Sequence, residues 1–179
     1  MTFLFVHRNA PAQFVHLIEQ LDRDGHRVCF ASQTVSKALP PRVRSLTLPE
    51  AAGKDKASVK KFELDLYEKY ARWKSKGLNP DWIILHCGWG LGLSLKSVFP
   101  NARLLVYAEW WFNFDSEDMN FDPGNPDVQF SASSRLAQMA RNGRYAHECL
   151  QADVLVSPTH WRSEEHTSEL QSQFRISYA

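Results

Sequence analysis

Short apolar runs alternate with longer segments of helical periodicity between Met1 and Trp161. The runs predict strands at Thr2–His7, Arg27–Ser32, Val43–Leu48, Trp82–His86, Arg103–Tyr107 and Asp153–Ser157. Between them, apolar positions spaced by three or four residues predict helices over Pro11–Asp24, Lys54–Lys76 and Ser133–Gln151. Strands that alternate with helices favour a parallel sheet with right-handed crossovers. The pattern therefore predicts an α/β fold.

Each predicted helix carries an apolar stripe that indicates which face packs on the sheet. The stripes are Phe14, Leu17, Ile18 and Leu21; Val59, Phe62, Leu66, Tyr70 and Trp73; and Leu136, Met139, Ala140, Ala146 and Leu150. A stripe of this width is normal core patterning, so we expect helices packed on a sheet. Gly25 is well placed to end the first helix, because glycine tolerates left-handed backbone geometry.

Length and composition narrow the class of protein. The 179 residues suit one domain, and a net charge of +1 gives no broad attraction to nucleic acid. The three cysteines, Cys29, Cys87 and Cys149, lie in apolar patterns, which favours buried thiols in a reducing compartment. No signal peptide and no apolar run of about 20 residues is evident. We therefore expect a cytoplasmic protein, with peripheral contact at the inner face of a membrane left open.

The segment Arg162–Ala179, RSEEHTSELQSQFRISYA, does not continue the preceding pattern. It is polar and resembles the in-frame translation of a sequencing-adapter oligonucleotide. We therefore expect residues 1–161 to form the native domain and residues 162–179 to be a disordered, non-native tail, with the natural gene continuing past Trp161. The alternative is a genuine solvated C-terminal tail.

Candidate chemistry gathers where the predicted strands end. His86 ends one strand and is followed by the loop Gly88-x-Gly90-x-Gly92, while Glu109 ends the next and precedes further aromatic residues. Open α/β sheets bind ligands beyond the carboxyl ends of their strands. Leu93 replaces the third glycine of the dinucleotide fingerprint, so the loop does not predict a nicotinamide site. A ligand-facing loop and a plain tight turn both stay open, as do ligand-binding and core roles for His86.

Other motifs point less clearly to chemistry. The acidic run Asp115–Asp118 superficially resembles a metal-binding motif, but a solvated acidic stretch within the long loop Phe112–Phe130 explains it better. No Cys/His set has zinc spacing, and no P-loop or nucleophile-elbow motif is present. Asn9 and Gln13 follow the first strand, where the loop of a parallel sheet borders the central cleft.

Several stretches, in order and spacing, resemble the N-terminal domain of glycosyltransferase family four proteins. They are FLFVHRNAPAQFVHL, DGHRV, LHCGWGLGLSLKSVFPNARLLVYAEWWF, FDP and ADVLVSPTHW. The resemblance covers most of residues 1–161. It implies the GT-B architecture, in which a Rossmann-like parallel sheet with helices on both faces forms the N-terminal half. It also implies transfer of a sugar (a hexosyltransferase reaction) from a nucleotide-sugar donor, with retention of configuration and without a metal or cofactor.

The resemblance further implies which residues face ligands. They are Asn9, Gln13, His86, Gly88, Trp89, Gly90, Glu109, Ser157 and Thr159. One departure is Ala12, where family members usually carry glycine, so a close backbone–phosphate contact there is in doubt. The catalytic residues and most of the donor site are expected in a C-terminal domain, the intramolecular partner, which this chain lacks. The chain alone is therefore expected to be inactive.

Two other interpretations of the residues stay open. One is a stand-alone, non-catalytic α/β module that binds a ligand or a partner. The other is a different α/β enzyme that uses His86 as base and Glu109 as acid, since the two end separate strands and could reach one ligand.

Overall fold

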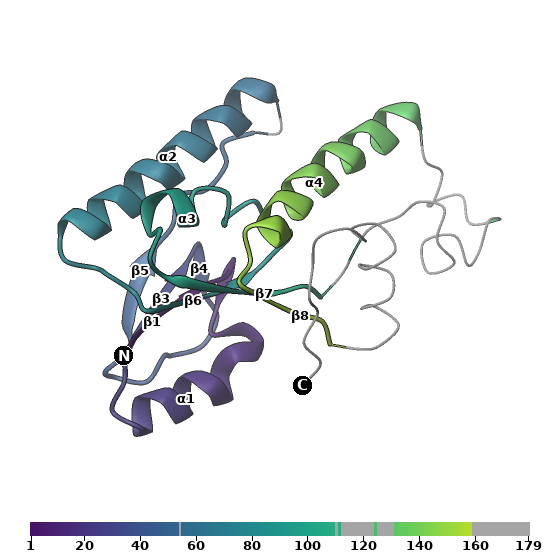
Figure 1. Ribbon diagram of the computed structural model, residues 1–179. Helices are drawn as coiled ribbons and strands as arrows, with labels where there is room; N and C mark the ends of the chain where they lie inside the picture. Colours follow the sequence, from purple (N-terminus) through teal and green to yellow (C-terminus); the bar gives the residue numbers. More distant parts are fainter. Residues whose placement is uncertain (54, 110, 112–123, 125–130, 159–179) are drawn as a thin grey trace.

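A parallel sheet forms the centre of the computed structural model, which describes residues 1–53, 55–109, 111, 124 and 131–158 (Figure 1). Its strands are β1 (Thr2–Val6), β3 (Arg27–Ser32), β5 (Arg44–Thr47), β6 (Trp82–His86), β7 (Arg103–Tyr107) and β8 (Val154–Val156). The order across this six-stranded sheet is β5-β3-β1-β6-β7-β8, and every pairing within it is parallel. This is the doubly wound order of Rossmann-like folds, so the predicted fold class is confirmed.

The central strand β1 joins the two halves of the sheet. On one side it pairs with β3, where Phe3 lies opposite Val28, and on the other with β6, where Phe3 lies opposite Trp82. From β1 the chain adds β3 and β5 on one side of the sheet, and then adds β6, β7 and β8 on the other side. The order of strands therefore reverses between β1 and β6. Their carboxyl ends therefore form the topological switch point, where ligands bind in this class of fold.

Helices cover both faces of the sheet, as predicted. The 3-10 turn η1 (Ala12–Phe14) and α1 (Val15–Arg23) lie on one face, and α2 (Lys56–Ser75), α3 (Leu95–Val98) and α4 (Ala132–Leu150) on the other (Figure 1). A small additional sheet pairs β2 (Asn9–Ala10) with β4 (Thr34–Val35). Strands of two residues leave no periodic signal, so the sequence pattern does not predict them.

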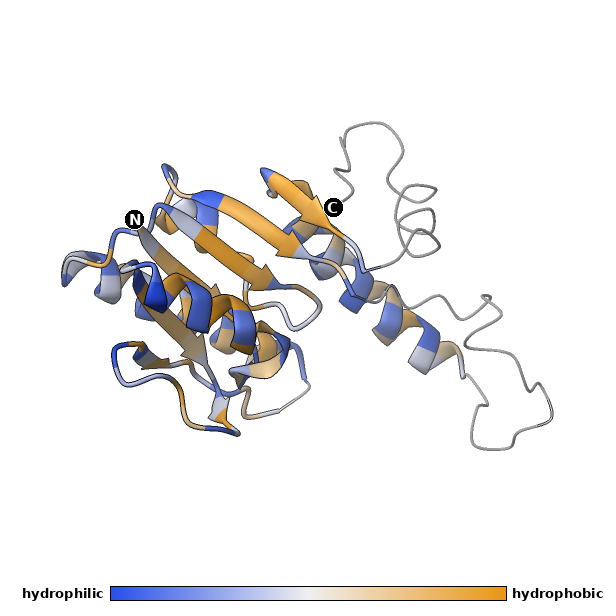
Figure 2. Ribbon diagram, turned by 90° about the horizontal axis from the view of Figure 1, so that it is seen from below, coloured by the Kyte–Doolittle hydropathy of each residue, from blue (hydrophilic) through white to orange (hydrophobic). Residues whose placement is uncertain are grey.

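Two apolar layers fill the space between the sheet and its helices, and the strands are largely apolar in Figure 2. The α1 layer is built around Phe5, Phe14 and Ile18. The opposite layer is larger and includes Leu66 and Leu85. The three cysteines are buried as free thiols, as expected. No helix in the described part of the chain is long and apolar enough to cross a membrane.

The apolar stripes of α2 and α4 do not pack throughout on the sheet. In α2 only the second half of the stripe is buried, while Val59 and Phe62 are half-buried. In α4 the buried residues are Tyr145, Glu148 and Cys149. Most of the stripe that the sequence pattern indicates is turned outward, with Leu136 66% and Met139 68% exposed, whereas Ala146 packs against the core. Helix α4 therefore packs through a face that includes a carboxylate.

Candidate functional site

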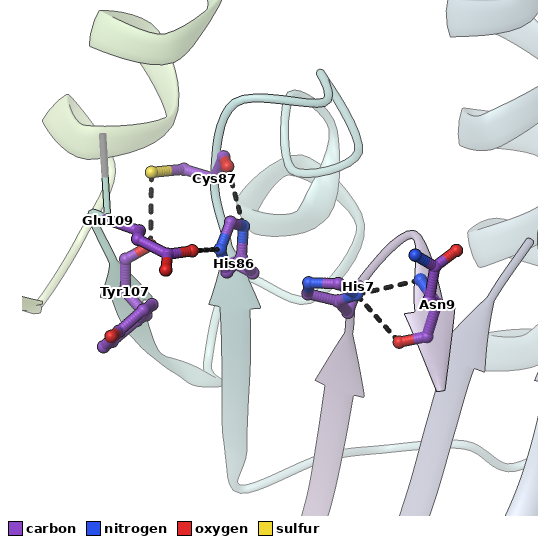
Figure 3. Close-up of polar contacts among 6 residues, drawn as sticks. All are labelled: His7, Asn9, His86, Cys87, Tyr107 and Glu109. Atoms are coloured by element: carbon purple, nitrogen blue, oxygen red, sulfur yellow. Dashed lines mark hydrogen bonds and ion pairs between the residues drawn. The ribbon is translucent and has the colours of Figure 1, made fainter. Parts of the chain in front are cut away.

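Two histidines lie side by side at the switch point between β1 and β6. His7 directly follows β1 and His86 ends β6, and their ring centroids are 4.6 Å apart in a perpendicular arrangement (Figure 3). Both side chains are buried. The sequence pattern indicates His86 as a candidate site residue but does not indicate His7. The signal for His7 was available, because it ends the first apolar run as His86 ends a later one.

His86 is joined to Glu109, which follows β7. The His86 Nε2 atom lies 2.8 Å from Glu109 Oε2, and its Nδ1 atom lies 3.0 Å from the carbonyl oxygen of Cys87 (Figure 3). The contact with Glu109 is an ion pair when the ring is protonated. The Glu109 side chain remains 54% exposed. The structure thus brings these two predicted residues together and leaves the carboxylate open to a ligand.

His7 is held as a neutral ring. Its Nδ1 atom lies 2.8 Å from the backbone nitrogen of Asn9 (Figure 3). Burial, together with the neighbouring His86, lowers the pKa of His7 to about 4. An uncharged imidazole has one ring nitrogen that donates a hydrogen bond and one that accepts, so it can bind a polar ligand without adding charge to the switch point.

The lowered pKa of His7 predicts a loss of stability in mild acid. In the unfolded chain this histidine takes up a proton as the pH falls through 6.5, whereas the folded protein resists until about pH 4. The stability that the neutral ring contributes is therefore present above pH 6.5 and is lost progressively toward pH 4. We expect urea unfolding to show a smaller loss between pH 7 and pH 5 in His7→Asn than in the unchanged protein. Equal losses in the two proteins would contradict this account.

The glycine loop, residues 88–92, presents Trp89. Gly88 and Gly90 adopt φ values of 101° and 71°, a region that favours glycine. Trp89 between them is 45% exposed and stacks on the His86 ring at a centroid distance of 6.5 Å. The Arg8 guanidinium carbon lies 5.1 Å from the centroid of the Trp89 ring. The indole therefore lies close to both an imidazole and a cation, while nearly half of its surface stays accessible.

A buried carboxylate on α4 fixes the glycine loop. Glu148 accepts the backbone N–H of Gly88 at 2.9 Å and that of Gly92 at 2.6 Å. Burial raises the pKa of Glu148 to about 7. From α2, the Tyr70 hydroxyl donates to the carbonyl oxygen of Leu91 at 2.9 Å. Glu148 was not predicted as a support of the site, because its only signal in the sequence is an acidic residue among the apolar positions of α4.

Three adjoining cavities share Trp89 as a lining residue. The first, of about 160 Å³, is lined by His86, Gly88, Glu109 and residues of α4. The second, of about 280 Å³, includes Arg8 and Thr34. The third is a groove of about 760 Å³ between α2 and α4. Trp89 therefore stands where these three spaces meet.

The remaining predicted residues lie at varying distances from this cluster. Asn9 is exposed, and its side-chain oxygen accepts a hydrogen bond from the Thr34 hydroxyl at 2.6 Å. Gln13 is exposed and Ser157 half-buried, and neither lines any of the three cavities. Among the described residues, the Ser157 hydroxyl oxygen has no hydrogen-bond partner. Thr159, the run Asp115–Asp118 and nearly all of the loop Phe112–Phe130 lie outside the described residues.

Ala12 occupies a backbone conformation that suits glycine better. Its φ of 49° falls in the left-handed region, which costs an L-residue about 1–2 kcal/mol. This explains why glycine would fit the position that the family resemblance assigns to it. The extra methyl group remains a physical reason to doubt a close backbone contact with phosphate there.

The arrangement is chemically suited to a polyhydroxylated ligand. An accessible carboxylate accepts hydrogen bonds from hydroxyl groups, and an exposed indole offers an apolar face. Concave sites with a few converging polar groups are where small molecules bind. His86, Gly88, Trp89, Gly90 and Glu109 therefore form one candidate site, with His7 and Glu148 as additional members.

Comparisons with known proteins concern the fold of the chain and its family. No curated protein matches the chain at a significant level. A solved structure, described as a UGT transferase from Siraitia grosvenorii in complex with UDP, matches with a TM-score of 0.52 and 13% sequence identity. The match covers 99% of this chain and 50% of that one, so the chain spans half the length of its structural neighbour. The likeness supports the Rossmann-like fold of a GT-B glycosyltransferase.

A family model adds to the structural likeness. The model, described as the glycosyl transferase family 4 group, matches residues 24–178. The prediction that residues 162–179 are a foreign tail concerns a segment outside the described residues and stays a prediction. Since the matched segment covers well over half of the sequence, the chain belongs to the glycosyl transferase family 4 group.

Proposed function

We propose that residues 1–161 form the acceptor-side, N-terminal domain of a retaining glycosyltransferase. The complete enzyme would transfer a hexose from a nucleotide sugar to a glycan, lipid or small-molecule acceptor. One observation carries the proposal: the His86–Glu109 contact of 2.8 Å lies beside the exposed indole of Trp89 at the switch point. This combination offers an aromatic face for the apolar side of a sugar ring and a carboxylate that accepts hydrogen bonds from its hydroxyl groups.

Each side chain has a distinct part in holding the acceptor. The apolar face of a sugar ring packs on Trp89, whose orientation is fixed by His86 and Arg8. The carboxylate of Glu109 accepts a sugar hydroxyl, and His86 positions that carboxylate through their hydrogen bond. Asn9 of β2 and Gln13 of η1, which follow β1 in the chain, complete the ligand-facing set that the family resemblance implies.

The donor half of the reaction is proposed to lie in a further domain. The structural neighbour is described in complex with UDP, and this chain spans half of that neighbour's length. We propose that a second domain supplies most of the nucleotide-sugar site and the catalytic groups, without a metal or cofactor. Residues 1–161 would then bind acceptor but would not transfer sugar by themselves.

Ligand-observed NMR of the purified chain tests this proposal. We expect saturation transfer to one or more sugars in a panel of neutral hexoses and disaccharides, and affinity at least tenfold weaker in Trp89→Ala. The control is Tyr67→Ala, because Tyr67 is 46% exposed on α2 and lines none of the three cavities. We also expect no sugar transfer from nucleotide sugars to the bound acceptor.

Two results would contradict the proposal in different ways. Robust transfer by the isolated chain would show that no further domain is needed, and would favour an enzyme that uses His86 and Glu109 directly. Failure of every sugar to bind a folded chain would remove the acceptor role and favour a binding module for a different ligand.

A further inference from the structure

The groove between α2 and α4 is separate from the small His86–Glu109 cavity but adjoins it at Trp89. It has a volume of about 760 Å³ and is lined by the first half of α2 and the middle of α4, which stand on the same side of the sheet (Figure 1). Gly90 of the glycine loop also lines it. A space of this size accommodates a ligand considerably larger than one hexose.

Cationic side chains dominate the charged lining of the groove. They are Lys56, Lys60, Arg141 and Arg144, and Glu63 is the acidic residue among the lining positions. The chain as a whole has a net charge of only +1, so this excess is local. A concave surface with one sign of charge concentrates ligands of the opposite sign.

Three of these cations are available to a ligand. Within the described part of the chain, Lys56, Lys60 and Arg144 form no ion pair. The nearby carboxylate of Asp55 is engaged at the start of α2, where it accepts the backbone N–H groups of Ala57 and Ser58. No ion pair within the described residues therefore neutralises these three cations, and Arg144 interacts electrostatically with the buried carboxylate of Glu148.

The apolar lining explains an unusual feature of α2. Val59 and Phe62 belong to the apolar stripe of this helix, yet both are half-buried and line the groove. Ala137 and Ala140 face the groove from α4, and Trp89 lines it from the glycine loop. The groove thus combines an apolar surface with several cations. It is suited to a ligand whose organic part packs on the apolar surface and whose compact anionic group contacts the cations.

We propose that this groove binds the phosphate group of a phosphorylated acceptor whose sugar lies on Trp89. The inference rests on the proposed acceptor role of the domain and adds the class of substrate. Lysine ammonium groups and the planar arginine guanidinium both bind phosphate oxygens well. A phosphate dianion carries two negative charges, so it suits a site with several cations better than a ligand with a single carboxylate. The phosphate can belong to a soluble sugar phosphate or to the headgroup of a lipid.

A matched pair of lysines tests the inference. Lys60 lines the groove, whereas its neighbour Lys61 pairs with Asp65 at 2.8 Å and does not line it. At fixed ionic strength, the purified chain is titrated with a panel of hexoses and the matched hexose 6-phosphates. We expect the best hexose 6-phosphate to bind at least tenfold tighter than its parent hexose. Lys60→Glu should abolish this preference, and Lys61→Glu should change it less than twofold, because a reversed charge repels phosphate strongly only at short range.

Co-sedimentation with phosphatidylcholine vesicles, with and without phosphatidate, distinguishes the two sources of phosphate. Binding to phosphatidate vesicles that is lost in Lys60→Glu but kept in Lys61→Glu supports a lipid-borne phosphate. Binding of hexose phosphates alone, with the same sensitivity, supports a soluble acceptor. In both cases the groove is the phosphate site.

Other outcomes overturn the inference. Equal weakening by Lys60→Glu and Lys61→Glu would indicate nonspecific attraction and no site. Equal affinity for a hexose and its phosphate, with binding still dependent on Trp89, would overturn the phosphate site but leave the acceptor role intact. Absence of binding by all sugars and sugar phosphates would overturn both.

Discussion

Replacing Gly92 with alanine should lower the free energy of unfolding by about 1–3 kcal/mol, the range typical of an overpacked core. A Cβ atom at this position would lie 2.2 Å from Leu85 Cδ2 and 3.0 Å from Glu148 Oε1. Leu85 is fully buried in β6, so its side chain cannot move aside without disturbing the core. The strain is steric, because Gly92 does not have a positive φ.

Gly143 provides the matched control for this substitution. It lies within α4, and a Cβ atom there would meet nothing within 4 Å. Gly143→Ala should therefore raise stability by roughly 0.5–1 kcal/mol, the helix-propensity difference between the two residues. Denaturant titrations of both variants check the pair. If Gly92→Ala is as stable as the unchanged protein, the glycine loop does not pack against Leu85 as described.

Replacing Glu148 with alanine should be at least as damaging. The substitution leaves the N–H groups of Gly88 and Gly92 without their acceptor in the interior, and each unsatisfied group costs about 1–3 kcal/mol. Glu148→Gln keeps the size and one acceptor oxygen, so its stability should fall between the other two. We expect chemical denaturation to show a loss of about 2–6 kcal/mol in the free energy of unfolding of the alanine variant. The exposed Glu68 is the control, and Glu68→Ala should stay within about 0.5 kcal/mol of the unchanged protein.

The raised pKa of Glu148 gives this prediction a pH signature. The folded-state pKa is about 7, against an ordinary value of 4.5 for a glutamate side chain, so the folded protein binds the proton more tightly. The stabilising effect of that proton is complete below pH 4.5 and is lost as the pH rises through about 7. Relative to Glu148→Gln, the unchanged protein should therefore gain stability between pH 8 and pH 5. A constant difference between the two proteins would show that Glu148 does not titrate in this range.

The strands were the most predictable part of the fold. Strands β3, β6 and β7 have the bounds that the sequence predicts, because central strands of a parallel sheet are apolar on both faces and read as continuous runs. His86 and Glu109 could be predicted as site residues because they lie at the carboxyl ends of two such strands. Both are adjacent to the switch point for reasons of topology alone.

The outward orientation of the apolar stripe on α4 could not be predicted in this way. Periodicity treats a glutamate as a solvent-facing residue, whereas Glu148 is buried because it accepts hydrogen bonds from Gly88 and Gly92. Those donors lie 60 and 56 residues earlier in the chain. A pattern within one helix contains no information about partners so distant. The same limit applies to the contact of His7 with His86, which exists only once β1 and β6 are paired.

The central position of β1 also determines when the site is assembled during synthesis. One edge of β1 can pair with β3 early, but its other edge must wait for β6, with Phe3 opposite Trp82. At the usual rate of about 5–20 residues per second, the ribosome needs roughly 4–16 s to synthesise the chain from Phe3 to Trp82. For that time a strongly apolar strand has one unpaired edge, the arrangement that invites association with other chains. The nascent protein therefore passes through an aggregation-prone interval that closes only when its two switch-point histidines meet.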